Sequence, residues 1–126
     1  MIDVGIVVKL AQAFPGGFIN GQGEFIAHEK GNAYFLLTDC DTELDVKCKV
    51  LEWLSRDAYK STPFQRCVKN TEFRKFIFYG ICKFLEHDFS FEDMEEIYTH
   101  IGNRVNHAKT VRFIESGYDL SVLKEG

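Results

Sequence analysis

The segment from Thr71 to Leu85 constrains the fold more than any other feature of this sequence, because it is apolar on nearly every side of a helix. Its apolar residues recur at intervals of three and four: Phe73, Phe76, Ile77, Ile81, Phe84 and Leu85, with Phe78 and Cys82 on the remaining faces. A helix without a polar face must be enclosed by other elements. We therefore expect a helix that is capped by Asn70 or Thr71 and is the central, most buried segment of the fold.

Two longer helices are predicted on either side of this segment. Asp41 or Thr42 can cap the first, which cannot continue past Pro63. Its apolar stripe comprises Leu44, Cys48, Leu51, Leu54 and Ala58, widened by Val46, Val50 and Trp53. The second begins at a capping box formed by Ser90 and Asp93 and stops at Gly102–Asn103. Its inward residues are predicted to be Met94, Ile97, Tyr98 and Ile101.

A shorter helix is predicted from about His107 to Ser116, with Gly117 as its stop. Its spacing indicates that Ala108, Val111 and Ile114 face the core. The apolar residues that follow can dock the tail onto the same core: Tyr118, Leu120, Val122 and Leu123.

Residues 4–14 fit two structures. A helical stripe of Val4, Val7, Val8, Ala11 and Phe14 would end at Pro15. The β-branched cluster of Val4, Ile6, Val7 and Val8, with Gly5 inside it, would suit a strand instead. We favour the helix, because the segment Ala11–Gln12–Ala13 is helix-forming and Asp3 can cap it.

Two strands are predicted at 24–28 and 33–37, and Lys30–Gly31–Asn32 between them suits a tight hairpin. A lone hairpin is marginal in water, so it must pack on helices or gain a third strand, for which Phe18–Ile19 is the candidate. We therefore predict an α+β fold: a mainly helical single domain, residues 1–126, with a small antiparallel β-hairpin packed against four to five helices.

The composition limits the class of protein. A chain of 126 residues that is 45% apolar is expected to form one domain with a true core. No stretch resembles a signal peptide, and the longest apolar run is far shorter than the ~20 residues of a membrane span. Cys40, Cys48, Cys67 and Cys82 form no CxxC pair. We therefore expect a cytoplasmic protein with free thiols and no contact with a membrane.

The C-terminal region carries the sharpest functional signal. A short acidic helix, a Gly-Asn turn and a helix with four positive or titratable groups follow one another; those groups are Arg104, His107, Lys109 and Arg112. The segment Thr110–Gly117 resembles the recognition helix of repressor-type helix-turn-helix proteins, which implies DNA binding by these four residues. However, Gly102 and Thr110 lie about three residues too far apart for that family, and the net charge of -4 repels the phosphate backbone. A solvated helical hairpin is therefore the favoured interpretation.

Other patterns point away from catalysis and cofactors. Asp39, Asp41, Glu43 and Asp45 alternate as in a calcium loop, but Leu44 and Val50 occupy the positions where Gly and Glu are required. The four histidines share no metal-ligand spacing, and the glycines near residue 20 lack a phosphate-loop motif. Cys40 with His28 is the best available pairing for nucleophilic catalysis, yet nothing marks the thiol as activated. We predict no metal, no cofactor and no enzymatic activity.

Over its full length, the chain resembles small uncharacterised proteins of phages and prophages of Gram-positive gut bacteria. Three segments carry this resemblance, at 20–28, 48–53 and 113–118. It implies an accessory protein of a mobile element, a class rich in inhibitors of host enzymes and defence systems. The leading prediction is therefore a protein that binds another protein. The alternatives are a helix-turn-helix DNA-binding regulator and a small-molecule-binding protein with an aromatic pocket.

Overall fold

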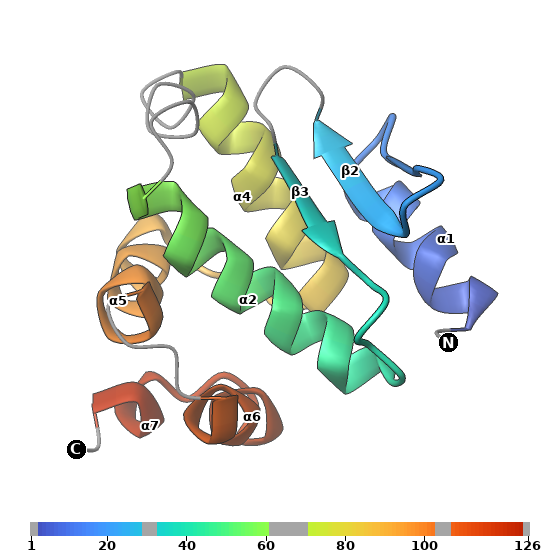
Figure 1. Ribbon diagram of the computed structural model, residues 1–126. Helices are drawn as coiled ribbons and strands as arrows, with labels where there is room; N and C mark the ends of the chain where they lie inside the picture. The colour runs from blue at the N-terminus through green and yellow to red at the C-terminus, as the bar shows by residue number, and fades with distance from the viewer. Residues whose placement is uncertain (1–2, 29–32, 61–70, 103–106, 125–126) are drawn as a thin grey trace.

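The computed structural model describes residues 3–28, 33–60, 71–102 and 107–124 of the chain (Figure 1). This part of the chain forms six helices and one three-stranded antiparallel sheet of order β1-β2-β3. The elements are α1 Val4–Ala13, β1 Phe18–Ile19, β2 Glu24–His28, β3 Ala33–Leu36, α2 Glu43–Lys60, α4 Thr71–Leu85, α5 Phe91–Gly102, α6 His107–Glu115 and α7 Leu120–Lys124. The α+β class predicted from the sequence is confirmed, with a short sixth helix, α7, in the tail.

Side-chain caps fix the starts of three helices. The Asp3 carboxylate accepts a hydrogen bond from the Gly5 N–H at 2.6 Å, which caps α1. Thr42 and Asp45 form a capping box on α2, since each side chain accepts from the other residue's N–H, both at 3.1 Å. Ser90 and Asp93 do the same on α5, as predicted. These caps satisfy backbone donors that a helix leaves unpaired at its start.

The helix α1 confirms the favoured structure of residues 4–14, but the predicted face is wrong. Ile6, Leu10 and Ala13 are buried, whereas Val4 and Val8 are exposed. Phe14, just after the helix, is fully buried as expected. The cause is that α1 carries two apolar stripes on opposite sides, and only one of them can face the core. The stripe with the larger Ile and Leu side chains is the buried one.

The sheet contains the predicted hairpin and the predicted third strand. Phe18 pairs with Ile26, and Ile19 pairs with Phe25, so β1 is an edge strand beside β2. Phe25 and Ala27 of β2 alternate toward the core, and the Phe25 ring lies 6.2 Å from the ring of Phe14. The hairpin turn predicted at 30–32 lies outside the described residues.

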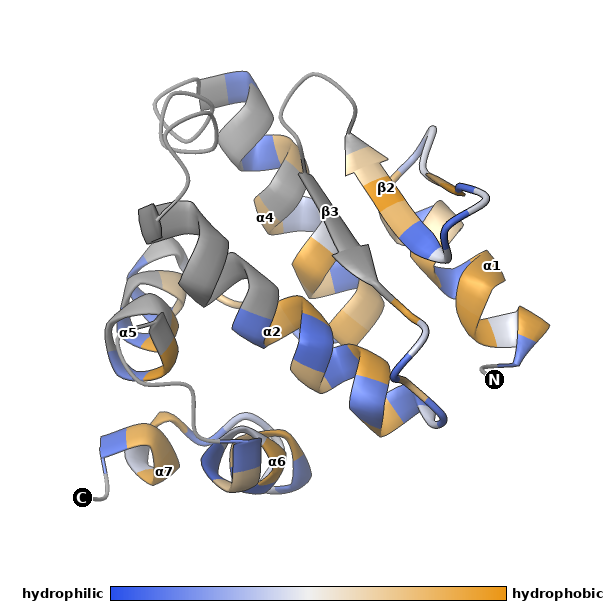
Figure 2. Cartoon of the chain, viewed as in Figure 1, coloured by the Kyte–Doolittle hydropathy of each residue, from blue (hydrophilic) through white to orange (hydrophobic). Residues whose placement is uncertain are grey.

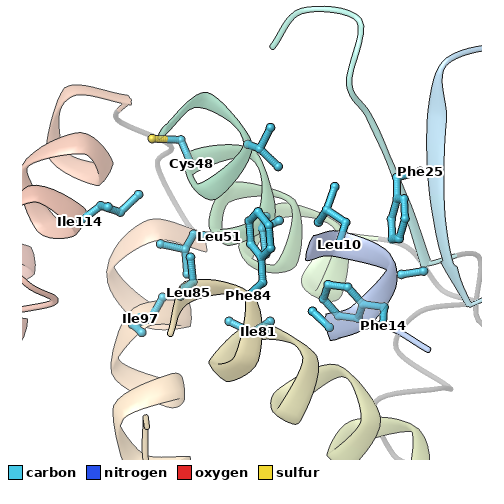
Figure 3. Packing of buried hydrophobic residues seen from close by; sticks show 14 of the residues in the cluster. Leu10, Phe14, Phe25, Cys48, Leu51, Ile81, Phe84, Leu85, Ile97 and Ile114 are labelled. Atoms are coloured by element: carbon cyan, nitrogen blue, oxygen red, sulfur yellow. The ribbon is translucent and has the colours of Figure 1, made fainter. Parts of the chain in front are cut away.

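The helix with the widest set of neighbours is α2, which contacts α4, α5, α6 and β3. Its buried residues are Val46, Cys48, Val50 and Leu51, which agrees with the predicted stripe; the side chains of Leu54 and Ala58 lie outside the description. One hydrophobic cluster runs from α1 and β2 through α2 and α4 to α5, α6 and α7. Figure 3 shows this packing, with Phe84 and Ile81 of α4 close to Leu51 of α2.

The helix predicted to be central, α4, lies beside α2 and α1. Ile81, Phe84 and Leu85 are buried, but Tyr79 is 64% exposed, so this helix keeps one open face. The central position therefore belongs to α2, which is long enough to contact α4 as well as α5 and α6. The cap predicted at Asn70 lies outside the described residues. No helix in the described ranges combines the length and the apolar character needed to cross a membrane.

The last two helices pack onto the rest as a unit. α7 contacts both α5 and α6, and its Leu123 is fully buried. Gly117, at a φ of 78°, ends α6 where the sequence predicts a stop, because this left-handed conformation suits glycine. Tyr118 follows, and its hydroxyl donates to the Leu85 carbonyl at 3.1 Å, which ties the tail to the end of α4.

Candidate functional site

The predicted DNA-reading helix, α6, has its buried face on residues other than those expected. Thr110 and Phe113 are fully buried and Ile114 is nearly so, whereas Ala108 is exposed and Val111 is half-buried. The prediction of an Ala108–Val111–Ile114 stripe is therefore wrong at Ala108 and confirmed at Ile114, while Val111 is half-buried and packs against the core. The large Phe113 ring releases more apolar area from water than Ala108 does, so its stripe is the one that packs against α2 and α7.

The four residues of the DNA-binding hypothesis are not gathered into one open stripe in the described structure. The ring Nδ1 of His107 lies 3.1 Å from a carboxylate oxygen of Glu52 on α2, although the His107 side chain is 63% exposed. Lys109 is half-buried and Arg112 is exposed, while Arg104 lies outside the described residues. Thr110, the first residue of the segment that resembles a recognition helix, is buried in the core.

The packing of α5 and α6 also differs from a helix-turn-helix pair. The principal contacts of both helices are with α2 and α7, which lie against them on either side. Acidic residues of α5 are engaged within the fold, because Glu96 lies 3.5 Å from His100 and 3.6 Å from Lys124. Both helices therefore pack on the rest of the fold, and the choice between a DNA-reading pair and a solvated hairpin stays a prediction.

The acidic residues that alternate near residue 40 serve the fold. Asp39 pairs with Lys49 at 2.6 Å, and Glu43 pairs with Lys9 at 2.8 Å. Hydrogen bonds from these lysines hold the pKa of both carboxyls below its usual range, and backbone N–H groups do the same for Asp45. No group of three or more metal-ligating side chains occurs in the described residues.

The described cysteines are free thiols in apolar surroundings. Cys40 and Cys48 are buried, Cys82 is half-buried, and Cys67 lies outside the described residues. Burial raises the pKa of Cys40 to about 11 and that of Cys48 to about 12. A thiol with such a pKa is a poor nucleophile at neutral pH. The His28 side chain, proposed as a partner of Cys40, lies outside the described part of the structure.

The feature that the sequence did not locate is an exposed apolar surface on α1 and β1. We call this the α1–β1 surface and define it by Val4, Val8, Phe18 and Ile19. Their exposed fractions are 76%, 48%, 44% and 39%. Figure 2 shows α1 coloured as hydrophobic over most of its length, and Figure 1 places α1 on the side of the molecule away from α5, α6 and α7.

Helix geometry explains why this surface exists. Successive residues of a helix turn by roughly 100°, so Val4 and Val8 project about 40° apart, while Ile6 and Leu10 project on the opposite side. Ala11 extends the outer stripe. The only sequence signal for this surface was the excess of apolar residues in 4–14. A helix with two apolar stripes on opposite sides can bury only one of them against the core.

The edge strand β1 continues this apolar character. Ile19 pairs with Phe25 and therefore points to the same face of the sheet, the face that packs on Phe14 at the end of α1. Phe18 projects from the other face. Both faces of β1 thus offer an apolar side chain at the open edge of the sheet.

Comparison of the chain with protein-family models, with curated proteins and with solved structures found no match.

Proposed function

We propose that this protein is non-enzymatic and binds another protein through the α1–β1 surface. The observation that carries the proposal is the second apolar stripe of α1, which is exposed beside an apolar edge strand. Several exposed apolar residues on consecutive elements mark an interaction site more often than a single exposed residue does. The resemblance to phage and prophage proteins suggests an accessory protein of a mobile element that inhibits a host enzyme or defence system.

The edge of the sheet favours an extended segment of the partner as the occupant. The Asn20 N–H donates to the Glu24 carbonyl at 3.0 Å, which makes Asn20 and Glu24 a hydrogen-bonded pair. Since such pairs alternate in an antiparallel ladder, Phe18 and Ile26 form the next one, and Ile19 directs its own N–H and C=O away from β2. A partner strand can use these outward groups, while its side chains contact the exposed apolar residues.

Charge favours a basic partner. The chain has a formal net charge of -4, so long-range attraction steers it toward a positively charged protein. The occupant we propose is therefore an extended apolar segment flanked by Lys and Arg residues. Nucleic-acid-binding clefts of host enzymes have this combination of charge and apolar contacts. Such enzymes work in the reducing cytoplasm, and the free thiols of the described cysteines suit that compartment.

Capture from a lysate of a Gram-positive bacterium tests this proposal through matched variants. Val8→Lys and Phe18→Lys place a charge on the α1–β1 surface, whereas Ala108→Lys places the same charge at an exposed site on α6. All three variants change the net charge equally. We expect the wild type and Ala108→Lys to capture the same lysate protein. Val8→Lys and Phe18→Lys should fail to capture it, although the circular dichroism spectra of all the variants should match that of the wild type.

Two results would contradict the proposal. One is that no retained protein distinguishes the surface variants from Ala108→Lys. The other is that the wild type sediments as a dimer and Val8→Lys as a monomer, which would make the surface a contact between two copies of this chain.

The DNA-binding alternative has weaker support. Its recognition helix buries Thr110 and Phe113, and His107 lies beside the Glu52 carboxylate. Buried side chains cannot contact a base or a phosphate, and Glu52 competes with a phosphate for His107.

A further inference from the structure

A pocket of about 470 Å³ opens at the C-terminal end of α4. It is lined by Tyr79, Cys82, Lys83, Glu86, His87 and Asp88. Tyr79, Cys82 and Lys83 lie at i, i+3 and i+4, so they share one side of α4, and the last three belong to the turn and loop that follow. Its volume is in the range of small-ligand sites.

The turn that shapes this pocket is strained at Glu86. The Glu86 N–H donates to the Lys83 carbonyl at 3.3 Å, and the His87 N–H donates to the Cys82 carbonyl at 3.0 Å. This pair of bonds ends a helix in the Schellman arrangement, whose left-handed residue is usually glycine. Here that residue is Glu86, at a φ of 56°. This conformation is unfavourable for a residue with a side chain, so Glu86 carries backbone strain.

Aromatic packing fixes the wall of the pocket. The His87 ring contacts the rings of Phe89 and Tyr118, with centroid distances of 4.6 and 4.9 Å, and those two rings contact each other at 5.3 Å. On the helix side, the Tyr79 ring is 64% exposed and is held edge-on by Phe78 at 5.6 Å. The pocket therefore has one ring fixed by neighbours and a second ring open to a ligand.

The charge of the pocket is negative. The carboxylates of Glu86 and Asp88 outnumber the single ammonium group of Lys83. The Cys82 thiol adds no charge, because burial raises its pKa. A cation placed here would meet two carboxylates and the face of an aromatic ring, which attracts positive charge.

We propose that this pocket binds an organic cation, namely a guanidinium or ammonium group on a short apolar stem. Glu86 and Asp88 hold the charge, and Tyr79 lies against the stem and the charged group. Free amines and the Lys or Arg side chains of a peptide share this chemistry. The site does not depend on the α1–β1 surface, so each proposal can fail without the other.

Titration with L-argininamide, followed by amide chemical shifts in NMR spectra, tests the site directly. We expect saturable shifts at Cys82 and at residues 86–88, with a dissociation constant on the order of 1 mM. L-citrullinamide, which keeps the α-ammonium group but has a neutral urea in place of the guanidinium group, should bind several-fold more weakly. A blocked Gly-Arg-Gly peptide that binds at least as tightly as L-argininamide would assign the site to a protein side chain, and weaker binding would assign it to a free amine.

Variants separate the pocket from general attraction to an acidic protein. The double variant Glu86→Gln, Asp88→Asn should weaken L-argininamide binding about tenfold or more. The double variant Glu92→Gln, Glu115→Gln removes two exposed acids elsewhere and should leave the affinity unchanged. Equal weakening in both double variants, or equal shifts with L-citrullinamide, would overturn the proposal.

Glu86→Gly gives a second test that does not rely on a loss of stability. Glycine relieves the left-handed strain, so we expect this variant to resist urea as well as or better than the wild type. It should nevertheless bind L-argininamide several-fold more weakly. A variant that is more stable and still binds at full strength would show that Glu86 has no part in the site.

Discussion

Gly80 lies where the Phe14 ring crosses α4, and a methyl group at this position would overlap the atoms Cδ1 and Cε1 of that ring. Glycine inside a helix costs about 1 kcal/mol relative to alanine, so its presence needs a compensating contact. The close approach of Phe14 is that contact. It fixes α1 against α4 and contributes to the choice of the buried stripe on α1.

Gly80→Ala is therefore expected to destabilise the protein, although the same change stabilises most helices. Overpacking costs roughly 1–3 kcal/mol and helix propensity returns about 1 kcal/mol, which leaves a net loss of up to about 2 kcal/mol in urea unfolding. In a Phe14→Leu background the loss should shrink. Gly21→Ala, where no atom lies within 4 Å of the added methyl group, serves as the control. A stabilised Gly80→Ala variant would refute the packing of α1 on α4.

Glu86 shows the limit of sequence reasoning at the residue scale. Stops at Gly102 and Gly117 were predicted because glycine signals a left-handed turn. The end of α4 has the same hydrogen bonds with Glu86 in the left-handed position, so the sequence carries no such signal. The pocket beside it could not be predicted for this reason.

At the scale of elements, the positions of the helices along the sequence were predictable, but the face that each helix buries was not. Caps such as Thr42 and Ser90 act within three residues, so the starts of α2 and α5 follow from local sequence. The buried faces of α1 and α6 depend on neighbours distant in sequence, and both helices carry two candidate stripes. The α1–β1 surface is the stripe left over by that choice, so only the tertiary structure could locate it.

The helix α6 is expected not to confer sequence-specific binding of duplex DNA. Thr110 faces the core, and the few remaining positive groups could neutralise only a few phosphates on a chain of net charge -4. We predict no defined complex in a gel-shift assay at micromolar protein in ~150 mM salt. A selected site that binds the wild type and is lost in the Lys109→Ala, Arg112→Ala double variant would restore the helix-turn-helix interpretation.

At the scale of the whole molecule, two thiols and one phenol that are uncharged in their protonated form lie in apolar surroundings. Burial raises the pKa of Cys40 to about 11 and the pKa values of Cys48 and Tyr118 to about 12. The ordinary values are 9.0 for the thiols and 10.0 for the phenol. At a pH between the ordinary and the raised pKa values, these groups have lost their protons in the unfolded chain but keep them in the folded chain. A rise in pH through this window therefore favours unfolding.

We expect the urea midpoint to fall steadily from about pH 9 to pH 11, as this linkage requires. The fall should be shallower in the double variant Cys48→Ala, Tyr118→Phe, whatever its stability at pH 7. Urea titrations at fixed ionic strength, followed by circular dichroism, measure the slope. A midpoint that stays constant across this range would mean that these groups are open to water in the folded state.

The central claim is that the chain binds a partner protein through the α1–β1 surface. Hydrogen–deuterium exchange tests it most directly, measured on the chain alone and on the chain saturated with the partner protein captured from the lysate. Binding through the α1–β1 surface predicts slower exchange in peptides that cover Val4–Ile19, because a partner strand would protect the outward N–H of Ile19. Peptides that cover His107–Glu115 should exchange at an unchanged rate. Protection confined to His107–Glu115, with none between Val4 and Ile19, would contradict the account and assign binding to α6.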